Sequence, residues 1–307
     1  MRYELMKSFG NKTLIMMLVI LMFVNGLEMF YHSKYYKHTF SVDENYTTED
    51  YHELISKAVS DIQNGEDIFL SKLLIETFKN REITNDAYDS KETEFVDYSK
   101  NGIYVMILIV LMVYFTIDTE RKSGMNRIIS ITSGKNTRII LMKQLSLAVC
   151  CFILNVVFLV EGIVEYKIIG GLDFGMKLYN VPGYFGTWFT GNILTYKIIC
   201  TMGMSLVHII IGNIIYIFAG LFEKIFAVIS VSVIMVLMYI CNKISPVNCF
   251  MNIFSFYDSG CLVRDFIVID MGNIVTYRLW AALVIVLVCA IAVNICNFLI
   301  YRKRRYV

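Results

Sequence analysis

The sequence predicts an all-α, polytopic membrane protein with six transmembrane helices and a small, mainly helical extracellular insertion between spans one and two. Three observations predict this fold class. The chain is 57% hydrophobic and only 18% charged, with a mean hydropathy of +0.59, whereas soluble domains are more polar. Several apolar runs approach the roughly 20 residues that cross a bilayer. The loops between these runs differ in charge, as the positive-inside rule requires.

The first span is expected at Leu14–Phe30, after the basic residues Arg2, Lys7 and Lys12. A signal peptide shares the basic start, but its apolar region is usually about 7–15 residues and a small-residue cleavage site follows it. Here the run is longer and continues into Glu28 and bulky side chains. Residues 1–31 are therefore interpreted as an N-terminal cytoplasmic helix and a retained first span.

Residues 32–101 form a polar insertion with fifteen acidic and eight basic side chains. Its negative balance suits the outer face of the membrane. Helical periodicity over Tyr51–Phe78 predicts helices, and a mobile linker is expected near Asn80–Asp97. The insertion could sense a ligand or form a structural cap.

The remaining spans follow from apolar runs separated by turn signals and charges. The second span is residues 102–117, and residues 144–307 hold the last four with a basic tail. The outer segment Asn242–Thr276 contains Cys249 and Cys261, which could form a disulfide or remain unlinked. The last four spans are expected at Leu145–Val164, Ile193–Gly220, Ile225–Cys241 and Leu279–Tyr301.

Six spans place both termini on the same side of the membrane. The basic N-terminus, the basic tail and the stretch 118–143 then all lie in the cytoplasm, while the acidic insertion lies outside. A cell-membrane location follows. The scarcity of Pro and the abundance of Ile, Lys, Asn and Tyr hint at a low-GC bacterium, so a bacterial plasma membrane is expected.

The stretch Asp118–Lys143 holds six basic and two acidic residues between two apolar runs. Eight charges at a bilayer centre would cost on the order of 20 kcal/mol, so the stretch leaves the membrane. Met125, Ile128, Ile129 and Thr132 recur at helical spacing, and Ser133-Gly134 ends that helix. A second helix is expected to begin near Asn136. The amphipathic helix could bind a groove of a soluble partner or lie on anionic lipid.

Several residues of this stretch follow a known pattern: Glu120-Arg121-Lys122-Ser123-Gly124, then Ile128-Ile129, Thr132-Ser133-Gly134, and finally Arg138 and Lys143. The pattern resembles the coupling helix of ABC transporter membrane subunits of the ABC-2 (export-type) permease class. Many members have Pro in the turn where this chain has Ser133-Gly134. The six-span plan, with a large outer insertion after span one, is similar to that family over the whole chain.

The resemblance implies a permease subunit that couples ATP hydrolysis by a separate cytoplasmic ABC ATPase subunit to export. It also implies a second permease copy, in a homodimer or heterodimer, and a surrounding of membrane lipid. The residues that it assigns to ATPase coupling are Glu120, Arg121, Lys122, Gly124, Arg127, Ile128, Ile129, Arg138 and Lys143.

The sequence holds no Walker A motif, so ATP is expected to bind the partner and not this chain. No clustered catalytic residues suggest an intramembrane enzyme, and no cofactor, metal or nucleic-acid site is expected. The alternative function is a membrane sensor or immunity protein that binds an external peptide without transporting it.

Single polar residues within the spans carry weaker expectations. His208 is expected to form hydrogen bonds between helices, and Lys197 is expected to extend its ammonium to the surface. Glu28, Glu161 and Glu165 near the outer ends of spans could line a substrate entrance or simply lie at the interface.

Overall fold

In the computed structural model, the described residues include a bundle of five long helices. It describes residues 10–35, 48–64, 68–79, 81, 91–98, 100–122, 136–181, 183–221, 252–264, 266, 268–270 and 275–303, with isolated positions between 229 and 240. All five helices are long and apolar enough to cross a membrane, as a multi-pass membrane protein requires. They are α2 (Lys12–Tyr35), α6 (Lys100–Lys122), α8 (Asn136–Gly170), α9 (Ile193–Leu221) and α11 (Arg278–Lys303).

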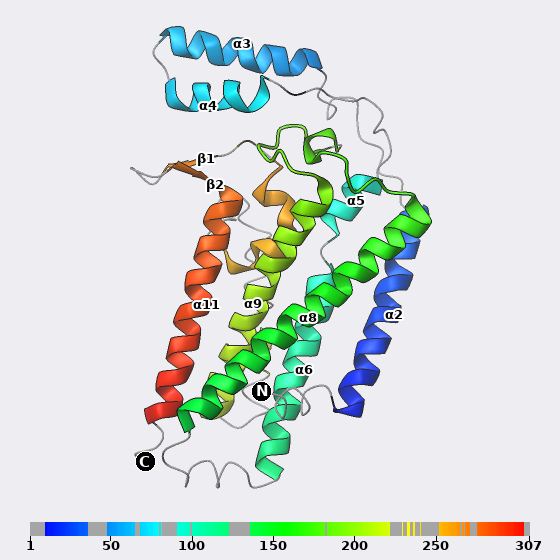
Figure 1. Ribbon diagram of the computed structural model, residues 1–307, viewed down its shortest axis with the longest axis vertical. Helices are drawn as coiled ribbons and strands as arrows, with labels where there is room; N and C mark the ends of the chain where they lie inside the picture. Colours follow the sequence, from blue (N-terminus) through cyan, green and yellow to red (C-terminus); the bar gives the residue numbers. More distant parts are fainter. Residues whose placement is uncertain are drawn as a thin grey trace.

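The five helices run side by side, and α8 crosses the others obliquely (Figure 1). We call the end near the small β-sheet the upper end, and the end where α6 stops and α8 begins the lower end. Helix α9 is central, because it packs against α6, α8 and α11, while α2 packs against α8 and α6. The side chains of α9 that face these neighbours are fully or almost fully buried, including Val207, Ile210, Ile211 and Ile215.

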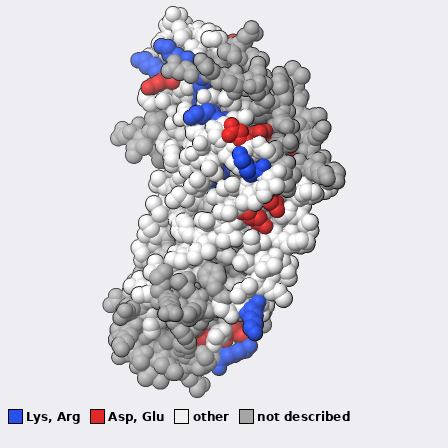
Figure 2. Space-filling view, turned by 45° about the vertical axis from the view of Figure 1, so that its right-hand side comes forward, with Lys and Arg blue, Asp and Glu red and all other residues white. Residues whose placement is uncertain are grey.

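The peripheral helices keep large apolar side chains on their outer faces. In α2 these include Val19, Phe23 and Leu27, and in α11 they include Val284, Val288 and Ile291, all at least 50% exposed. A helix that is apolar on all sides fits a lipid environment. On the face shown in Figure 2, charged side chains gather toward the two ends, and an uncharged band separates them.

Shorter elements cover the upper end (Figure 1). Helices α3 (Thr48–Asn64) and α4 (Ile68–Phe78) pack on each other as a hairpin, and Phe78 contacts Phe185 and Phe266 below. Closer to the bundle lie α5 (Lys91–Asp97), the 3₁₀ helices η2 (Leu178–Asn180) and η4 (Ile253–Leu262), and the antiparallel strands β1 (Val268–Asp270) and β2 (Val275–Tyr277).

The sheet is held to the bundle by aromatic side chains. Its strands pair in the register Val268↔Tyr277 and Asp270↔Val275. The Trp188 ring stacks on that of Tyr277 with centroids 4.0 Å apart and the planes 8° from parallel. Strand β2 leads directly into α11 at Arg278, so this stack fixes where α11 begins.

Several sequence predictions are confirmed. The all-α class holds for the described residues apart from the small sheet, helices occupy most of 51–78, and a helix begins at Asn136 and continues through the third predicted span. The fifth predicted span, Ile225–Cys241, falls mostly outside the described residues. Its described positions, Ile229, Ser232, Val233, Val236 and Ile240, are helical and exposed. Cys249 of the possible disulfide also lies outside them.

One predicted boundary was wrong. The linker expected at Asn80–Asp97 ends in a helix, α5, because Phe95 and Val96 are buried in the main core and anchor it. The two ends of the stretch 118–143 are continuous with the neighbouring spans, as expected: residues up to Lys122 continue α6, and residues from Asn136 belong to α8.

Candidate functional site

The predicted coupling residues lie at the lower end of the bundle. Glu120 and Lys122 occupy the last turn of α6, and Lys143 lies two turns into α8. Arg121 and Arg138 are helical, but their side chains are not among those described. Gly124, Arg127, Ile128 and Ile129 lie outside the described residues, so their predicted roles stay predictions.

The structure brings Glu120 and Lys143 together. The Lys143 ammonium donates to Glu120 Oε2 at 2.6 Å, with the two side chains 13% and 5% exposed. The neighbouring pair, Lys122 and Asp118, is 2.8 Å apart on the same helix, and its lysine is 78% exposed. The hydrogen bond to Asp118 raises the pKa of Lys122. Among the ion pairs of the described residues, the Glu120–Lys143 pair is the one that joins two helices in a mostly buried setting, where an ion pair is screened little by water.

Further polar contacts extend this link across the lower half of the bundle. Gln144, next to Lys143, donates to the Asn294 carbonyl of α11 at 2.9 Å. Asn297, one turn farther along α11, donates to Asn213 Oδ1 of α9 at 2.8 Å, and both side chains are buried. Such hydrogen bonds between spans hold membrane helices in a fixed arrangement. Four helices are therefore joined in the order α6, α8, α11 and α9.

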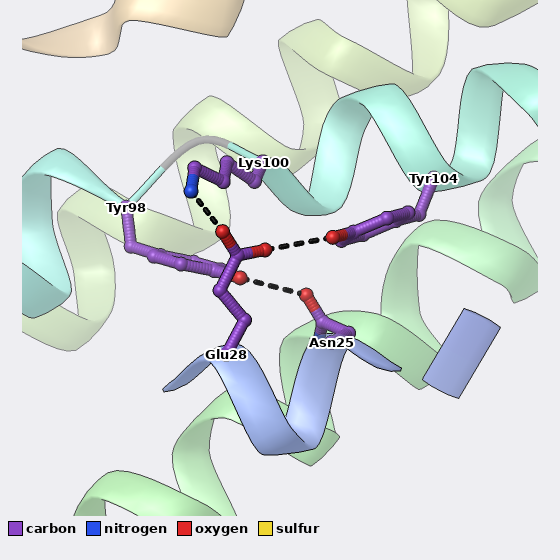
Figure 3. A network of polar contacts seen from close by, with 5 residues as sticks. All are labelled: Asn25, Glu28, Tyr98, Lys100 and Tyr104. Atoms are coloured by element: carbon purple, nitrogen blue, oxygen red, sulfur yellow. Dashed lines mark hydrogen bonds and ion pairs between the residues drawn. The ribbon is translucent and has the colours of Figure 1, made fainter. Parts of the chain in front are cut away.

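A second polar network lies nearer the upper end, where α2 meets the start of α6 (Figure 3). Tyr98 donates its hydroxyl hydrogen to Asn25 Oδ1 at 2.9 Å, and Tyr104 donates to Glu28 Oε2 at 2.7 Å. Lys100 forms an ion pair with the other oxygen of Glu28. Asn25 is fully buried although it interrupts the apolar run of α2. These contacts satisfy its amide and fix α2 against α6.

The glutamates of α8 also face α2. Asn25 donates from Nδ2 to Glu161 Oε2 at 2.8 Å. Gly26 lets Glu165 approach closely, because a Cβ on Gly26 would lie 2.6 Å from Glu165 Oε1. Glu28 and Glu161 thus make specific bonds between helices, which a merely interfacial position would not require.

His208 joins four elements at the centre of the bundle. Asn155 of α8 donates from Nδ2 to the backbone of Cys151 and lies 2.9 Å from His208 Nδ1, so Nδ1 is the acceptor. The hydrogen therefore sits on Nε2, which faces the Gly102 carbonyl at 3.0 Å and the Tyr257 hydroxyl at 2.7 Å. The predicted role of His208, hydrogen bonding between helices, is confirmed.

Two glycines make room for this arrangement. A Cβ on Gly203 of α9 would lie 2.4 Å from the Phe256 ring, and one on Gly102 would lie 2.6 Å from Met204 Sδ. The segment η4 can therefore enter between α6 and α9, and Phe254, Phe256 and Tyr257 are at most 3% exposed.

The expectation for Lys197 was wrong. Its side chain does not extend to the surface but is only 9% exposed, and its ammonium donates to the Tyr98 carbonyl at 2.9 Å. It also lies 5.4 Å from the centre of the Phe95 ring. Helix α5, which the sequence did not predict, covers the lysine and provides this ring.

The end of α5 is clamped by a third cluster. Asp97 accepts a hydrogen bond from the hydroxyl of Tyr184, and Arg264 Nη2 lies 3.1 Å from its Oδ2. Burial raises the pKa of Tyr184, and the negative charge of Asp97 raises it further. Gly260 is required beside them, because a Cβ there would lie 2.9 Å from the Tyr184 hydroxyl. The cluster ties α5 to the loop between η2 and α9, which holds Tyr184, and to the end of η4, which Arg264 follows.

No protein-family model, no curated protein and no solved structure matches this chain. The family resemblance of the stretch 118–143 therefore rests on its own residues and on the plan of the spans.

Sequence reasoning missed Asn25, Tyr98 and Tyr257 as members of the polar networks. Asn25 left a signal, because an amide inside an apolar run must find a partner in the protein. The two tyrosines left none, since tyrosine is common in loops and at membrane interfaces alike.

Proposed function

We propose that this chain is the membrane-spanning permease subunit of an ATP-driven exporter of the ABC-2 type. In this proposal the lower end of the bundle faces the cytoplasm, and a separate ABC ATPase subunit binds the stretch 118–143. The observation that carries the proposal is the buried ion pair between Glu120 and Lys143. It ties together the two helices, α6 and α8, that contain the two ends of the stretch 118–143.

The ion pair supports a mechanical role for the connection between α6 and α8. A force applied to the residues between them would act on both helices at once. The contacts of Gln144 with Asn294 and of Asn297 with Asn213 would pass that force to α11 and α9. Rigid-body movement of packed helices is a common way to switch a membrane domain between states.

The positions of the helix ends support the predicted six-span plan. Helices α2 and α8 begin at the lower end, and α6 and α11 stop there (Figure 1). Helix α9 also ends at the lower end with Leu221, whereas the next described long element, η4, lies near the upper end. A sixth crossing at Ile225–Cys241 would connect them, and it would leave both termini in the cytoplasm and the α3–α4 hairpin outside.

In the proposed complex, Arg121, Lys122 and Arg127 make polar contacts with the ATPase, and Ile128 and Ile129 fill its groove. The test is the double substitution Ile128→Asp with Ile129→Asp in the tagged full-length chain. We expect loss of co-purification with the ATPase, or loss of transport-linked ATP hydrolysis, with normal membrane insertion. The matched control is Val59→Asp with Ile68→Asp, two aliphatic residues of the α3–α4 hairpin that are 41% and 44% exposed.

Unchanged ATPase binding and coupling in the Ile128/Ile129 variant would refute this assignment. A chain that purifies without any Walker A protein, but retains an external peptide, would instead favour the sensor or immunity function.

A further inference from the structure

A small cavity lies inside the upper half of the bundle, between α2, the α5–α6 junction, α8 and α9. Its volume is about 40 Å³, enough for a few water molecules or one small polar group. Its walls combine apolar side chains with polar ones. The apolar wall includes Met29, Phe95, Leu159 and Met204, and the polar wall includes Asn101, Tyr166 and Lys197.

Lys197 gives this cavity a buried positive charge. The ammonium can donate three hydrogen bonds, and its one hydrogen bond to a described residue goes to the Tyr98 carbonyl. Within the part of the chain that the structure describes, no carboxylate lies within ion-pair distance of it. The charge of Asp97 acts on it only from beyond that distance. A buried charge without a counter-ion in direct contact is costly, and in a membrane span it marks a binding site or pathway more often than packing.

Two other polar groups of the cavity lack partners among the described residues. Tyr166 is only 1% exposed, and its hydroxyl makes no hydrogen bond. Asn101 donates from Nδ2 to the Phe158 carbonyl, but its Oδ1 is buried and accepts nothing. Such groups are rare in native interiors unless water or a ligand completes them. The residues that line the cavity thus include an ammonium and a hydroxyl as donors, and one amide oxygen as an acceptor.

The depth of the cavity indicates where a ligand would come from. Lys197 lies one helical turn from the start of α9, and Tyr166 lies one turn from the end of α8. In a bilayer that α8 and α9 span, this depth is the level at which lipid headgroups meet the hydrocarbon core. The helices around the cavity also carry exposed apolar side chains nearby, including Leu27 and Phe30 of α2 and Val160 and Val164 of α8.

We propose that this cavity binds the anionic phosphate group of a membrane lipid from the leaflet at the upper end. Lys197 and Tyr166 donate to the phosphate oxygens, and a hydroxyl of the headgroup donates to Asn101. The cavity holds the polar group alone, because its volume leaves no room for acyl chains, which lie on the apolar outer faces of α2 and α8. This inference is independent of ATP coupling and holds for a transporter or a sensor.

The test is lipid binding by the purified full-length chain after delipidation in detergent, followed by native mass spectrometry. The probes are phosphatidylglycerol, a monoacylglycerol that has hydroxyls but no phosphate, and inorganic phosphate. Lys197→Met removes the charge, and Tyr166→Phe removes only the hydroxyl. Lys177→Met is the matched control, because Lys177 is an exposed lysine of the loop after α8.

We expect phosphatidylglycerol to bind the unmodified chain and the Lys177 variant equally. Loss of a charge-assisted hydrogen bond should weaken binding roughly 10–100-fold in the Lys197 variant, and loss of the hydroxyl about 3–10-fold in the Tyr166 variant. The monoacylglycerol should bind at least about tenfold more weakly than phosphatidylglycerol. The Lys197 variant should fold, since an apolar chain of similar length replaces a buried charge.

Equal affinity of the Lys197 variant and the unmodified chain for phosphatidylglycerol would overturn the proposal. The same holds if the monoacylglycerol binds as tightly, or if nothing binds and the cavity contains water alone. Inorganic phosphate could also bind as tightly as phosphatidylglycerol and depend on Lys197 in the same way. That result would show that the ligand is a free anion, and it would overturn the assignment to a lipid.

Discussion

Removal of the Lys143 ammonium tests how strongly α6 and α8 are held together at the lower end. In Lys143→Met, the Glu120 carboxylate loses the ammonium that lies 2.6 Å away, while the Glu120 side chain, which is only 5% exposed, stays buried. Breaking a buried ion pair by removing one partner costs about 3–5 kcal/mol. For a chain of this size, that loss lowers the melting temperature by roughly 6–10 °C, at about 2 °C per kcal/mol.

Thermal unfolding of the purified chain in detergent, followed by circular dichroism at the helix band, measures this shift. Lys122→Met is the matched control, because it removes a neighbouring lysine whose side chain is 78% exposed, and it should leave the melting temperature nearly unchanged. The two tryptophans, Trp188 and Trp280, provide a second readout. Because Trp188 packs at the upper end, a fluorescence transition that shifts equally would show that the bundle unfolds as one unit.

The double variant Glu120→Gln with Lys143→Met separates the ion pair from its surroundings. It removes both charges, and such replacements are often nearly neutral. At least half of the loss in the single variant should therefore be recovered, with a coupling energy of about 1–3 kcal/mol. The reasoning is refuted if Lys143→Met shifts the melting temperature no more than Lys122→Met does.

Three further substitutions test the packing around the polar networks by the same unfolding assay. Gly203→Ala places a Cβ 2.4 Å from Phe256 and should lower the free energy of unfolding by about 1–3 kcal/mol. Its control, Gly162→Ala, should be neutral or stabilising, because the new Cβ would have no neighbour nearer than 3.7 Å. A larger loss in the Gly162 variant than in the Gly203 variant would contradict the placement of η4. Tyr257→Phe removes the hydroxyl 2.7 Å from His208 Nε2. It should lower the free energy of unfolding by only about 0.5–1.5 kcal/mol, since Nε2 keeps its contact with the Gly102 carbonyl. A larger loss would mean that the Tyr257 hydroxyl, and not the carbonyl, is the main partner of Nε2. Asn25→Leu removes the amide that Glu161 and Tyr98 share and should lower the free energy of unfolding by about 1–3 kcal/mol. Phe23→Leu is the control and should have little effect, because the Phe23 side chain is 67% exposed. Equal stability of the two variants would show that the network of Figure 3 contributes no stability.

Hydropathy alone was enough to locate five of the six predicted spans as long helices among the described residues. The runs predicted at Leu14–Phe30, Leu145–Val164 and Leu279–Tyr301 each fall within a described helix. About 20 apolar residues in a row are typical of a membrane-spanning helix, so hydropathy alone predicts them. Helical periodicity also located α3 and α4. The helix from Asn136 into the third span could be predicted equally well, since no proline or glycine lies between Asn136 and the start of that span.

The elements that the sequence did not reveal are short and depend on their surroundings. Helix α5 has only seven residues and would be marginal in isolation. It persists because Phe95 and Val96 are buried against the bundle and Asp97 is held by Tyr184 and Arg264. The 3₁₀ helix η4 was assigned to an outer loop, since its entry between α6 and α9 depends on Gly102 and Gly203 in other helices.

By itself, the sequence determined that this chain is a helical protein with segments long and apolar enough to span a membrane, and it predicted that the charged stretch 118–143 leaves the membrane. The tertiary structure alone decided that Glu120 faces Lys143, that Tyr257 reaches His208, and that Lys197 is buried beside a cavity. The physical reason is that membrane helices are apolar on all sides, so their periodicity does not mark an inner face. Which polar side chain meets which partner then depends on how each helix is rotated and tilted, and only the packing of the bundle fixes that.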